Sequence, residues 1–406
     1  MKVCALDRLK RRRKLWLSIH LWLGLILGLF LAMFGITGSI LVFQEEIDEW
    51  LNPTLLTVSP ASDSAPYKPL ADIFEAGRTV VPDNAKHSFA YYPRNGEAAF
   101  KLDYRVARTP ELTETWQVYV DPYSARVLGK RLMASSDSSI PKTFIGFVFE
   151  LHYALLLGET VGYPVVGIMG ALLILSVLTG MIVWWPLTGK WRQALTIKAR
   201  ASVERLNFDL HKTFGFYTIP VMLPVLFSGI YMNLPQYVAP VIELFSPVTY
   251  RYWFESTPIR DTAPITMAQA VALADNRFPG GRTDLIYGAP EATDTYTVCK
   301  HDVVEPGSLL TRRCVVLDRY TGKLLDVDDP ATGTGGEVFT QWQWPLHSGR
   351  AFGWTGRILV FLTGIACPVL CATGFIRWLQ KRRSNYVKMK KVCRINPPLK
   401  RLENAG

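Results

Sequence analysis

The pattern of apolar and polar residues divides the chain into four long apolar runs and two long mixed segments. The first run, residues 21–42, is about as long as a membrane-spanning helix requires, and it lies between a basic stretch and an acidic one. Comparable runs follow at 163–185, 214–234 and 354–379. The pattern therefore predicts four transmembrane helices.

Positive charge is concentrated beside these runs. Lys and Arg cluster at residues 8–14, 190–212 and 377–401. Because short loops rich in Lys and Arg stay in the cytoplasm, we expect both termini and the loop 186–212 to be cytoplasmic, and the two mixed segments to be periplasmic. The net charge of +11 therefore reflects membrane topology, and we expect no nucleic-acid partner. The first run is too long for a cleaved secretion signal, so we expect it to remain as a span.

These signals predict an order of segments along the chain. We expect a basic cytoplasmic tail at 1–15, a first transmembrane helix at 16–43 and a periplasmic domain at 45–150, followed by an interfacial segment with the second transmembrane helix at 151–185. A cytoplasmic loop at 186–212 should lead to a third transmembrane helix at 213–234, a second periplasmic domain at 235–345, an interfacial segment with the fourth transmembrane helix at 346–379, and a cytoplasmic tail at 380–406.

The two mixed segments resemble each other. Each begins with a helix-like stretch and continues with the alternation typical of strands. Residues 118–128 match residues 315–325 without a gap, and the spacing of His20 and Gly38 equals that of His211 and Gly229. The sequence therefore predicts an internally duplicated α-helical membrane protein, with four transmembrane helices and two small periplasmic α+β domains.

Four of the six histidines lie at the mouths of the predicted spans. His20 and His211 begin spans one and three at the cytoplasmic face, whereas His152 and His347 precede spans two and four at the outer face. Topology and symmetry predict two pairs, His20 with His211 and His152 with His347. Two imidazoles from facing helices can hold a six-coordinate haem, which suits electron transfer. One haem near each face would join the two sides of a bilayer about 30 Å thick.

Other interpretations of these residues stay open. A bare metal such as zinc would need further ligands, and only Glu150 and Asp209 stand beside the paired histidines. Arg350 is predicted to bind a haem propionate, with a lipid phosphate as the alternative partner. The remaining histidines, His87 and His301, are interpreted as ordinary domain residues.

Cysteine usage leaves one question open. Cys299 and Cys314 flank a Pro-Gly turn region, where either a disulfide across a hairpin or two free thiols are consistent with the sequence. No CxxCH motif occurs, so we do not expect covalent attachment of haem.

The four histidine motifs resemble those of the PepSY-associated transmembrane helix family. They read Leu-His20-Leu-Trp-x-Gly, Glu-Leu-His152, Asp-Leu-His211-Lys-x-x-Gly-Phe and Leu-His347-Ser-Gly-Arg-x-Phe-Gly. The resemblance covers roughly residues 10–385, and the paired strand-turn-strand phrases are similar to PepSY domains. Within the family, the chain looks like the inner-membrane siderophore-iron reductases of Gram-negative bacteria. This resemblance implies two b-type haems and reduction of a ferric siderophore in the periplasm.

Two other classes of function remain alternatives. One is a membrane-anchored PepSY protein with a binding or regulatory role and no redox chemistry, and the other is a siderophore permease. An anchor needs no histidine at all four span mouths, and a transporter usually carries polar residues in mid-membrane. No nucleotide-binding motif occurs, so we expect electrons to come from a partner protein, a soluble flavin or a quinol.

Overall fold

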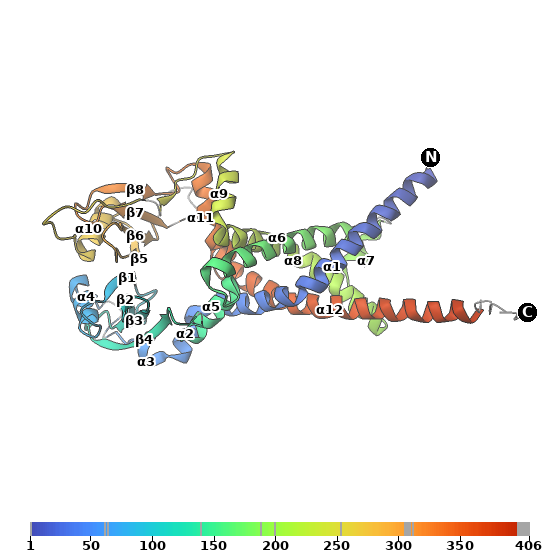
Figure 1. Ribbon diagram of the computed structural model, residues 1–406, viewed down its shortest axis with the longest axis horizontal. Coiled ribbons are helices and arrows are strands. Elements are labelled where there is room, and N and C mark those ends of the chain that lie inside the picture. The colour runs from blue at the N-terminus through green and yellow to red at the C-terminus, as the bar shows by residue number, and fades with distance from the viewer. Residues whose placement is uncertain are drawn as a thin grey trace, which may run out of the picture. The chain divides into compact units, whose positions relative to one another are not determined.

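Four long helices dominate the computed structural model (Figure 1), which describes residues 2–395 apart from 61, 63–64, 139, 187–188, 199, 252–253, 304–309 and 311. Four helical segments of the described chain are long and apolar enough to cross a membrane: Arg11–Val42, Gly158–Trp184, Val203–Asn233 and Arg350–Ser384. They belong to helices α1 (Lys2–Val42), α6 (Gly158–Trp184), α8 (Val203–Asn233) and α12 (Gly353–Ile395). The predicted class, a multi-pass membrane protein, is confirmed.

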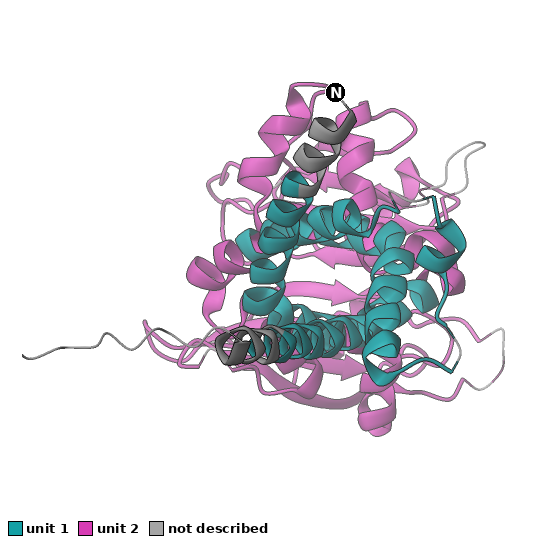
Figure 2. Ribbon diagram, turned by 90° about the vertical axis from the view of Figure 1, so that its right-hand side faces the viewer, with its two compact units in different colours: residues 1–39, 168–227, 357–406 teal, residues 40–167, 228–356 magenta. Residues whose placement is uncertain are grey.

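The chain divides into two compact units, which Figure 2 colours separately. Unit 1 comprises residues 1–39, 168–227 and 357–406, and it contains most of each long helix together with the short helix α7 (Trp191–Leu195). Small residues bring α1 and α12 close together, since a Cβ added at Gly35 would meet the backbone carbonyl of Gly364. The Ser39 hydroxyl strengthens this contact by donating to the carbonyl of Phe361 at 3.0 Å.

Unit 2 comprises residues 40–167 and 228–356, and it contains an eight-stranded antiparallel sheet in the order β4-β3-β2-β1-β5-β6-β7-β8. The strands are β1 (Lys86–Tyr91), β2 (Phe100–Ala107), β3 (Thr113–Val120), β4 (Val127–Ser135), β5 (Arg282–Tyr287), β6 (Tyr296–His301), β7 (Arg313–Leu317) and β8 (Leu324–Asp328). Helix α4 (Leu70–Arg78) precedes the first four strands, and helix α10 (Met267–Arg277) precedes the last four.

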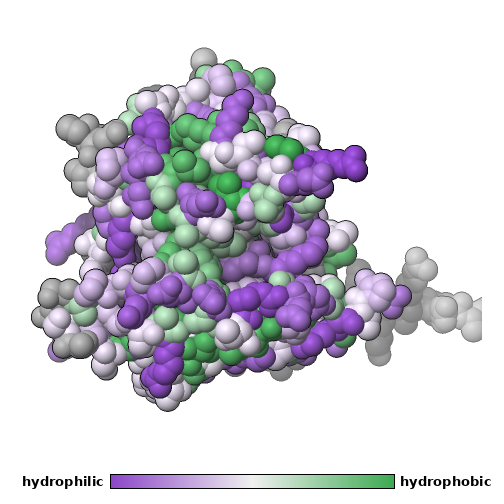
Figure 3. All heavy atoms as spheres, turned by 90° about the vertical axis from the view of Figure 1, so that its left-hand side faces the viewer, coloured by the Kyte–Doolittle hydropathy of each residue, from purple (hydrophilic) through white to green (hydrophobic). Residues whose placement is uncertain are grey.

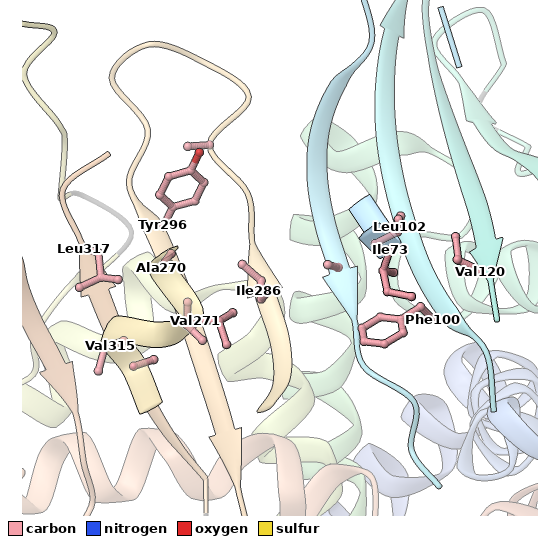
Figure 4. Close-up of a cluster of buried hydrophobic side chains, with 14 of the residues drawn as sticks. Ile73, Phe100, Leu102, Val120, Ala270, Val271, Ile286, Tyr296, Val315 and Leu317 are labelled. Carbon is pink, nitrogen blue, oxygen red and sulfur yellow. The ribbon is translucent and has the colours of Figure 1, made fainter. Parts of the chain in front are cut away.

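Helices α4 and α10 cover one face of the sheet and form a single core with it. Figure 4 shows Ile73 of α4 against Phe100 and Leu102, and Ala270 and Val271 of α10 near the strands of the other half. The face of the molecule drawn in Figure 3 carries hydrophilic and hydrophobic residues side by side. The two mixed segments of the sequence are thus joined into one sheet, because β1 pairs with β5 through Phe89 to Tyr287 and Tyr91 to Leu285.

The remaining short helices of unit 2 are α2 (Gln44–Leu51), α3 (Pro53–Leu56), α5 (Phe144–Ala154), α9 (Pro235–Glu243), α11 (Gly335–His347) and the 3-10 turn η2 (Arg350–Phe352). Helix α3 packs on the opposite face of the sheet, where Leu56 contacts Ala99 and Tyr119, and other short helices of unit 2 contact the sheet edges. At one edge, Arg131 of β4 donates to both carboxylate oxygens of Asp48 on α2, at 2.8 and 2.6 Å. At the other edge, Gln341 of α11 donates to Asp328 of β8. Each edge strand is therefore joined by side-chain hydrogen bonds to a short helix of unit 2.

Arg251 strengthens the contact between strand β8 and helix α11. Its guanidinium forms ion pairs with Asp326 at 2.6 Å, with Asp328 at 3.0 Å and with Glu337 at 2.9 Å. Glu337 also caps α11, because its side chain accepts from the backbone N–H of Thr334 at 2.8 Å while Thr334 accepts from the N–H of Glu337. The start of α11 is therefore fixed to strand β8.

A disulfide joins Cys299 and Cys314, which lie directly opposite each other on β6 and β7. The sequence left open a disulfide or two free thiols, and the structure contains the disulfide. The Pro-Gly turn between the two cysteines lies outside the described residues.

Candidate functional site

The first candidate site is a pair of histidines on facing helices of unit 1. His20 of α1 and His211 of α8 have ring centres 6.3 Å apart, with their planes at 64°. The sequence predicted this pair from topology and symmetry. The structure brings the two rings together, although they lie far apart in the chain.

Hydrogen bonds orient both inner rings. Nδ1 of His20 lies 2.9 Å from the carbonyl oxygen of Ser176 on α6. A carbonyl can only accept, so Nδ1 carries the proton and Nε2 keeps its lone pair.

Nδ1 of His211 lies 3.0 Å from the hydroxyl oxygen of Thr373 on α12. That hydroxyl donates to the carbonyl of Val369 at 2.6 Å, so its oxygen is free to accept from Nδ1. Both inner rings are therefore oriented with Nε2 available as a ligand, which is the usual arrangement of metal-bound histidine.

Glycines lie directly against the paired rings. A Cβ at Gly180 would lie 2.9 Å from Cε1 of His20, and a Cβ at Gly374 would lie 3.2 Å from Cε1 of His211. Both distances are shorter than the ordinary carbon–carbon contact of about 3.5–4.0 Å. Glycine is therefore required at these positions if the rings are to keep their places.

The second candidate site is the pair of His152 and His347 in unit 2. His152 lies on α5, and His347 is the last residue of α11. Their ring centres are 6.1 Å apart and their planes lie at 71°, close to the values of the inner pair. Nδ1 of His347 lies 3.0 Å from the hydroxyl of Ser228, and a Cβ at Gly229 would lie 3.2 Å from its Cε1. The outer pair thus repeats the inner spacing, and the surroundings of His347 repeat those of His211.

The spacing of both pairs matches two imidazoles that share one metal ion. Nitrogen–metal distances of about 2.0–2.1 Å, with about 1.1 Å from each nitrogen to its ring centre, place the two ring centres about 6.3 Å apart. The observed values are 6.3 and 6.1 Å. Two histidines at this spacing could hold a haem iron, and the glycines give the rings clearance.

The charged residues that the sequence placed near these histidines have protein partners. Arg350, predicted to bind a haem propionate, forms an ion pair with Glu45 at 3.0 Å, and its propionate role stays a prediction. Glu150 accepts a hydrogen bond from the hydroxyl of Tyr153 at 2.7 Å. Asp209 is fully buried and pairs with Lys212 at 2.9 Å and with Arg205 at 3.0 Å.

The other two histidines lie on strands of the sheet. His301 at the end of β6 lies 3.4 Å from a carboxylate oxygen of Asp284. His87 of β1 packs edge-on against Phe74 and Tyr104, and neither of its ring nitrogens has a hydrogen-bond partner among the described residues. Burial lowers the pKa of His87 to about 3, so this ring is neutral at physiological pH.

Sequence reasoning missed the residues that orient the histidines. Ser176, Thr373 and Ser228 were not assigned to the sites, nor were Gly180 and Gly374. A signal was present, since the dipeptides Thr179-Gly180 and Thr373-Gly374 follow His152 and His347 at almost equal distances. Within the described chain, no group of three or more His, Cys, Asp or Glu side chains is arranged to hold a metal ion.

The fold and these sites define a multi-pass membrane protein with an α+β part and two pairs of facing histidines. Residues 17–381 match the PepSY-associated TM region, so the chain belongs to the PepSY-associated transmembrane family, as the sequence motifs predicted. No curated protein matches the chain.

Proposed function

We propose that this protein is a di-haem transmembrane oxidoreductase of the bacterial inner membrane, which passes electrons from the cytoplasmic side to the periplasm and reduces a ferric siderophore there. The observation that carries the proposal is the pair of matched histidine spacings, 6.3 Å for the inner pair and 6.1 Å for the outer pair. A single close pair can arise from packing alone, but two pairs with the same spacing favour a shared chemical role.

The protein side chains have definite parts in this proposal. His20 with His211, and His152 with His347, would hold the iron of two b-type haems. Haem iron held in this way supplies reversible one-electron transfer. Ser176 and Thr373 hold the inner imidazoles with the proton on Nδ1, so that Nε2 keeps its lone pair for a metal ion. Gly180, Gly374 and Gly229 keep space beside the rings.

The expected substrate follows from coordination chemistry. Siderophores bind Fe(III) through hard oxygen donors, which hold Fe(II) far less tightly because of its lower charge. One electron delivered to the chelate therefore releases the metal and leaves the siderophore intact. The basic segments beside the spans favour cytoplasmic termini, and they support a periplasmic location for the sheet and the outer pair. Electrons would enter from a cytoplasmic donor or a quinol.

A spectrum of the purified protein tests the proposal. Protein from haem-replete cells should show a Soret band, and dithionite should sharpen the α-band. His20→Ala and His347→Ala should each lower haem content by about half, whereas His301→Ala, a histidine outside both pairs, should leave it unchanged. A protein without a Soret band would refute the redox proposal and leave the anchor and permease alternatives. A full haem complement in both paired variants would refute the ligand assignment.

Reduction itself needs a separate assay. Proteoliposomes with an internal reductant should convert an external Fe(III) chelate to Fe(II), which a ferrous-specific chromophore reports. The His20→Ala variant should abolish this conversion while the haem of the outer pair stays bound. Equal rates for wild type and for His20→Ala would contradict a path that includes the inner pair.

A further inference from the structure

Helix α9 carries an apolar stripe that faces away from the protein. The helix follows α8 after a single residue, Leu234, so it begins where a membrane span ends. The most exposed apolar side chains of this stretch are Tyr237 at 68%, Val241 at 55%, Leu244 at 79% and Phe245 at 87%. Tyr237 and Val241 lie one turn apart on α9, and Leu244 and Phe245 directly follow its last residue; we call these four exposed side chains the stripe.

The rest of α9 faces two other directions. Ala239 is buried, and Val238 and Ile242 are partly buried, so this side packs against the protein. Gln236 and Glu243 are exposed beside the apolar stripe. A helix with a packed side, an exposed apolar stripe and an exposed polar edge has the pattern of a helix that lies in the plane of a membrane surface.

We propose that the partner of this stripe is the surface of the bilayer, into which Tyr237, Val241, Leu244 and Phe245 insert beside the outer end of α8. Continuity with a membrane span supports this occupant, because the helix starts at the level where the apolar span finishes. The corresponding helix of the first half supports it too. Helix α2 begins two residues after α1 ends, and it leaves Trp50 79% exposed.

We expect the insertion to be driven by burial of apolar side chains and not by electrostatic attraction. Helix α9 contains no Lys or Arg, and its one charged residue is Glu243. A basic helix would bind anionic lipid in preference and would lose that binding in salt. The stripe should therefore insert equally well into zwitterionic and anionic bilayers, and salt should not release it.

The stripe is also connected to the helix that carries His347. Just after α9, the hydroxyl of Ser246 accepts from the backbone N–H of Gly336 at 2.8 Å, and the carbonyl of Pro247 accepts from the hydroxyl of Thr334 at 2.5 Å. A Cβ at Gly336 would meet the backbone of Ser246 and Pro247, so the contact is close. Insertion of α9 should therefore hold the start of α11 in place.

Photochemical crosslinking tests the partner directly. We would introduce p-benzoylphenylalanine in place of Phe245, reconstitute the full chain into phosphatidylcholine vesicles with and without phosphatidylglycerol, and identify adducts by mass spectrometry after irradiation. The same probe in place of Tyr287, an exposed aromatic residue of strand β5, serves as the control. We expect lipid adducts at position 245 in both membranes and none at position 287.

Other results would overturn the proposal. Adducts at position 245 to a second copy of the chain would assign the stripe to a dimer interface, and absence of any adduct would assign it to water. An adduct that forms only with anionic lipid would contradict apolar insertion.

Hydrogen exchange of the peptide that includes Gly336 gives a second, independent readout. The double variant Leu244→Gln and Phe245→Gln should lower its protection in nanodiscs, whereas the neighbouring polar-edge variant Gln236→Ala should not. Unchanged protection in the double variant would refute the connection to α11. Neither measurement depends on haem or on reduction, so the inference stands or falls separately from the proposed function.

Discussion

Under the proposed function, the clearance beside three of the paired histidines makes a graded prediction about haem binding. In Gly180→Ala, the new Cβ would lie 2.9 Å from Cε1 of His20. An ordinary carbon–carbon contact is about 3.5–4.0 Å, so the ring must retreat by about 0.6–1.1 Å. Metal–ligand distances tolerate only about 0.2 Å, so this movement is incompatible with an intact axial bond. We expect Gly180→Ala to lose most of the inner haem.

Substitutions at other glycines allow the loss of haem to be compared with the size of the steric clash. Gly374→Ala and Gly229→Ala would each place a Cβ 3.2 Å from a histidine carbon, which requires a smaller retreat of about 0.3–0.8 Å. We expect them to weaken the inner and the outer haem, respectively. Gly24 lies on α1 one turn after His20 and has no atom within 4 Å of an added Cβ, so Gly24→Ala is the matched control.

Haem per protein and the reduced α-band report these outcomes in purified variants. The reasoning requires the order of loss to follow the clearances, with Gly180→Ala most affected and Gly24→Ala unchanged. Full haem content with an unchanged α-band in Gly180→Ala would show that the glycine does not determine the position of the ring. Equal losses in all four variants would point to a general loss of helix packing, and they would equally refute the reasoning.

Three further predictions concern the sheet of unit 2. Burial lowers the pKa of His87 from 6.5 to about 3, so its neutral form stabilises the fold fully above pH 6.5 and less as the pH drops towards 3. The wild-type fold should lose about 2 kcal/mol of stability from this residue between pH 8 and pH 5, and His87→Phe should abolish that loss, measured by hydrogen exchange of β1. Burial raises the pKa of Asp103 from 3.8 to about 6, so the protonated carboxyl stabilises the fold fully below pH 3.8 and this stability is lost as the pH rises through 6. Asp103→Asn should therefore stabilise β2 by about 3 kcal/mol at pH 8 and by almost nothing at pH 3.5. An equal effect at both pH values would contradict this. Arg251→Gln should weaken the attachment of α11 by about 3 kcal/mol, because three carboxylates lose their partner, and faster hydrogen exchange of the α11 amides should report it. Arg260→Gln is the control, because this side chain is 96% exposed, and it should have little effect on that exchange.

The four spans and the two histidine pairs could be predicted from the sequence. Hydropathy identifies a span because the bilayer fixes its length, and the basic segments beside the spans predict their direction. Once direction is assigned, His20 and His211 share one face and His152 and His347 share the other. Proximity within each pair then followed from the repeated spacing, without any knowledge of how the helices pack.

The rest of the fold depended on contacts that no local pattern contains. The pairing of β1 with β5 joins strands almost two hundred residues apart, and each strand alternates in the same way whether it is central or at an edge. The partners of the histidines depended on helix rotation. A rotation of one residue would turn Ser176 and Gly180 away from His20, and hydropathy does not determine that angle.

The hydrogen bonds of the histidines show why both halves of the chain are needed. Nδ1 of His20 is held by Ser176 of α6, the second span of the first half, and Nδ1 of His211 is held by Thr373 of α12, the second span of the second half. His347 follows the same rule, since its partner Ser228 lies in α8 of its own half. In both pairs, however, the facing ring comes from the other half. These three imidazoles are therefore oriented by residues of their own half, and only the association of the two halves brings the paired rings together.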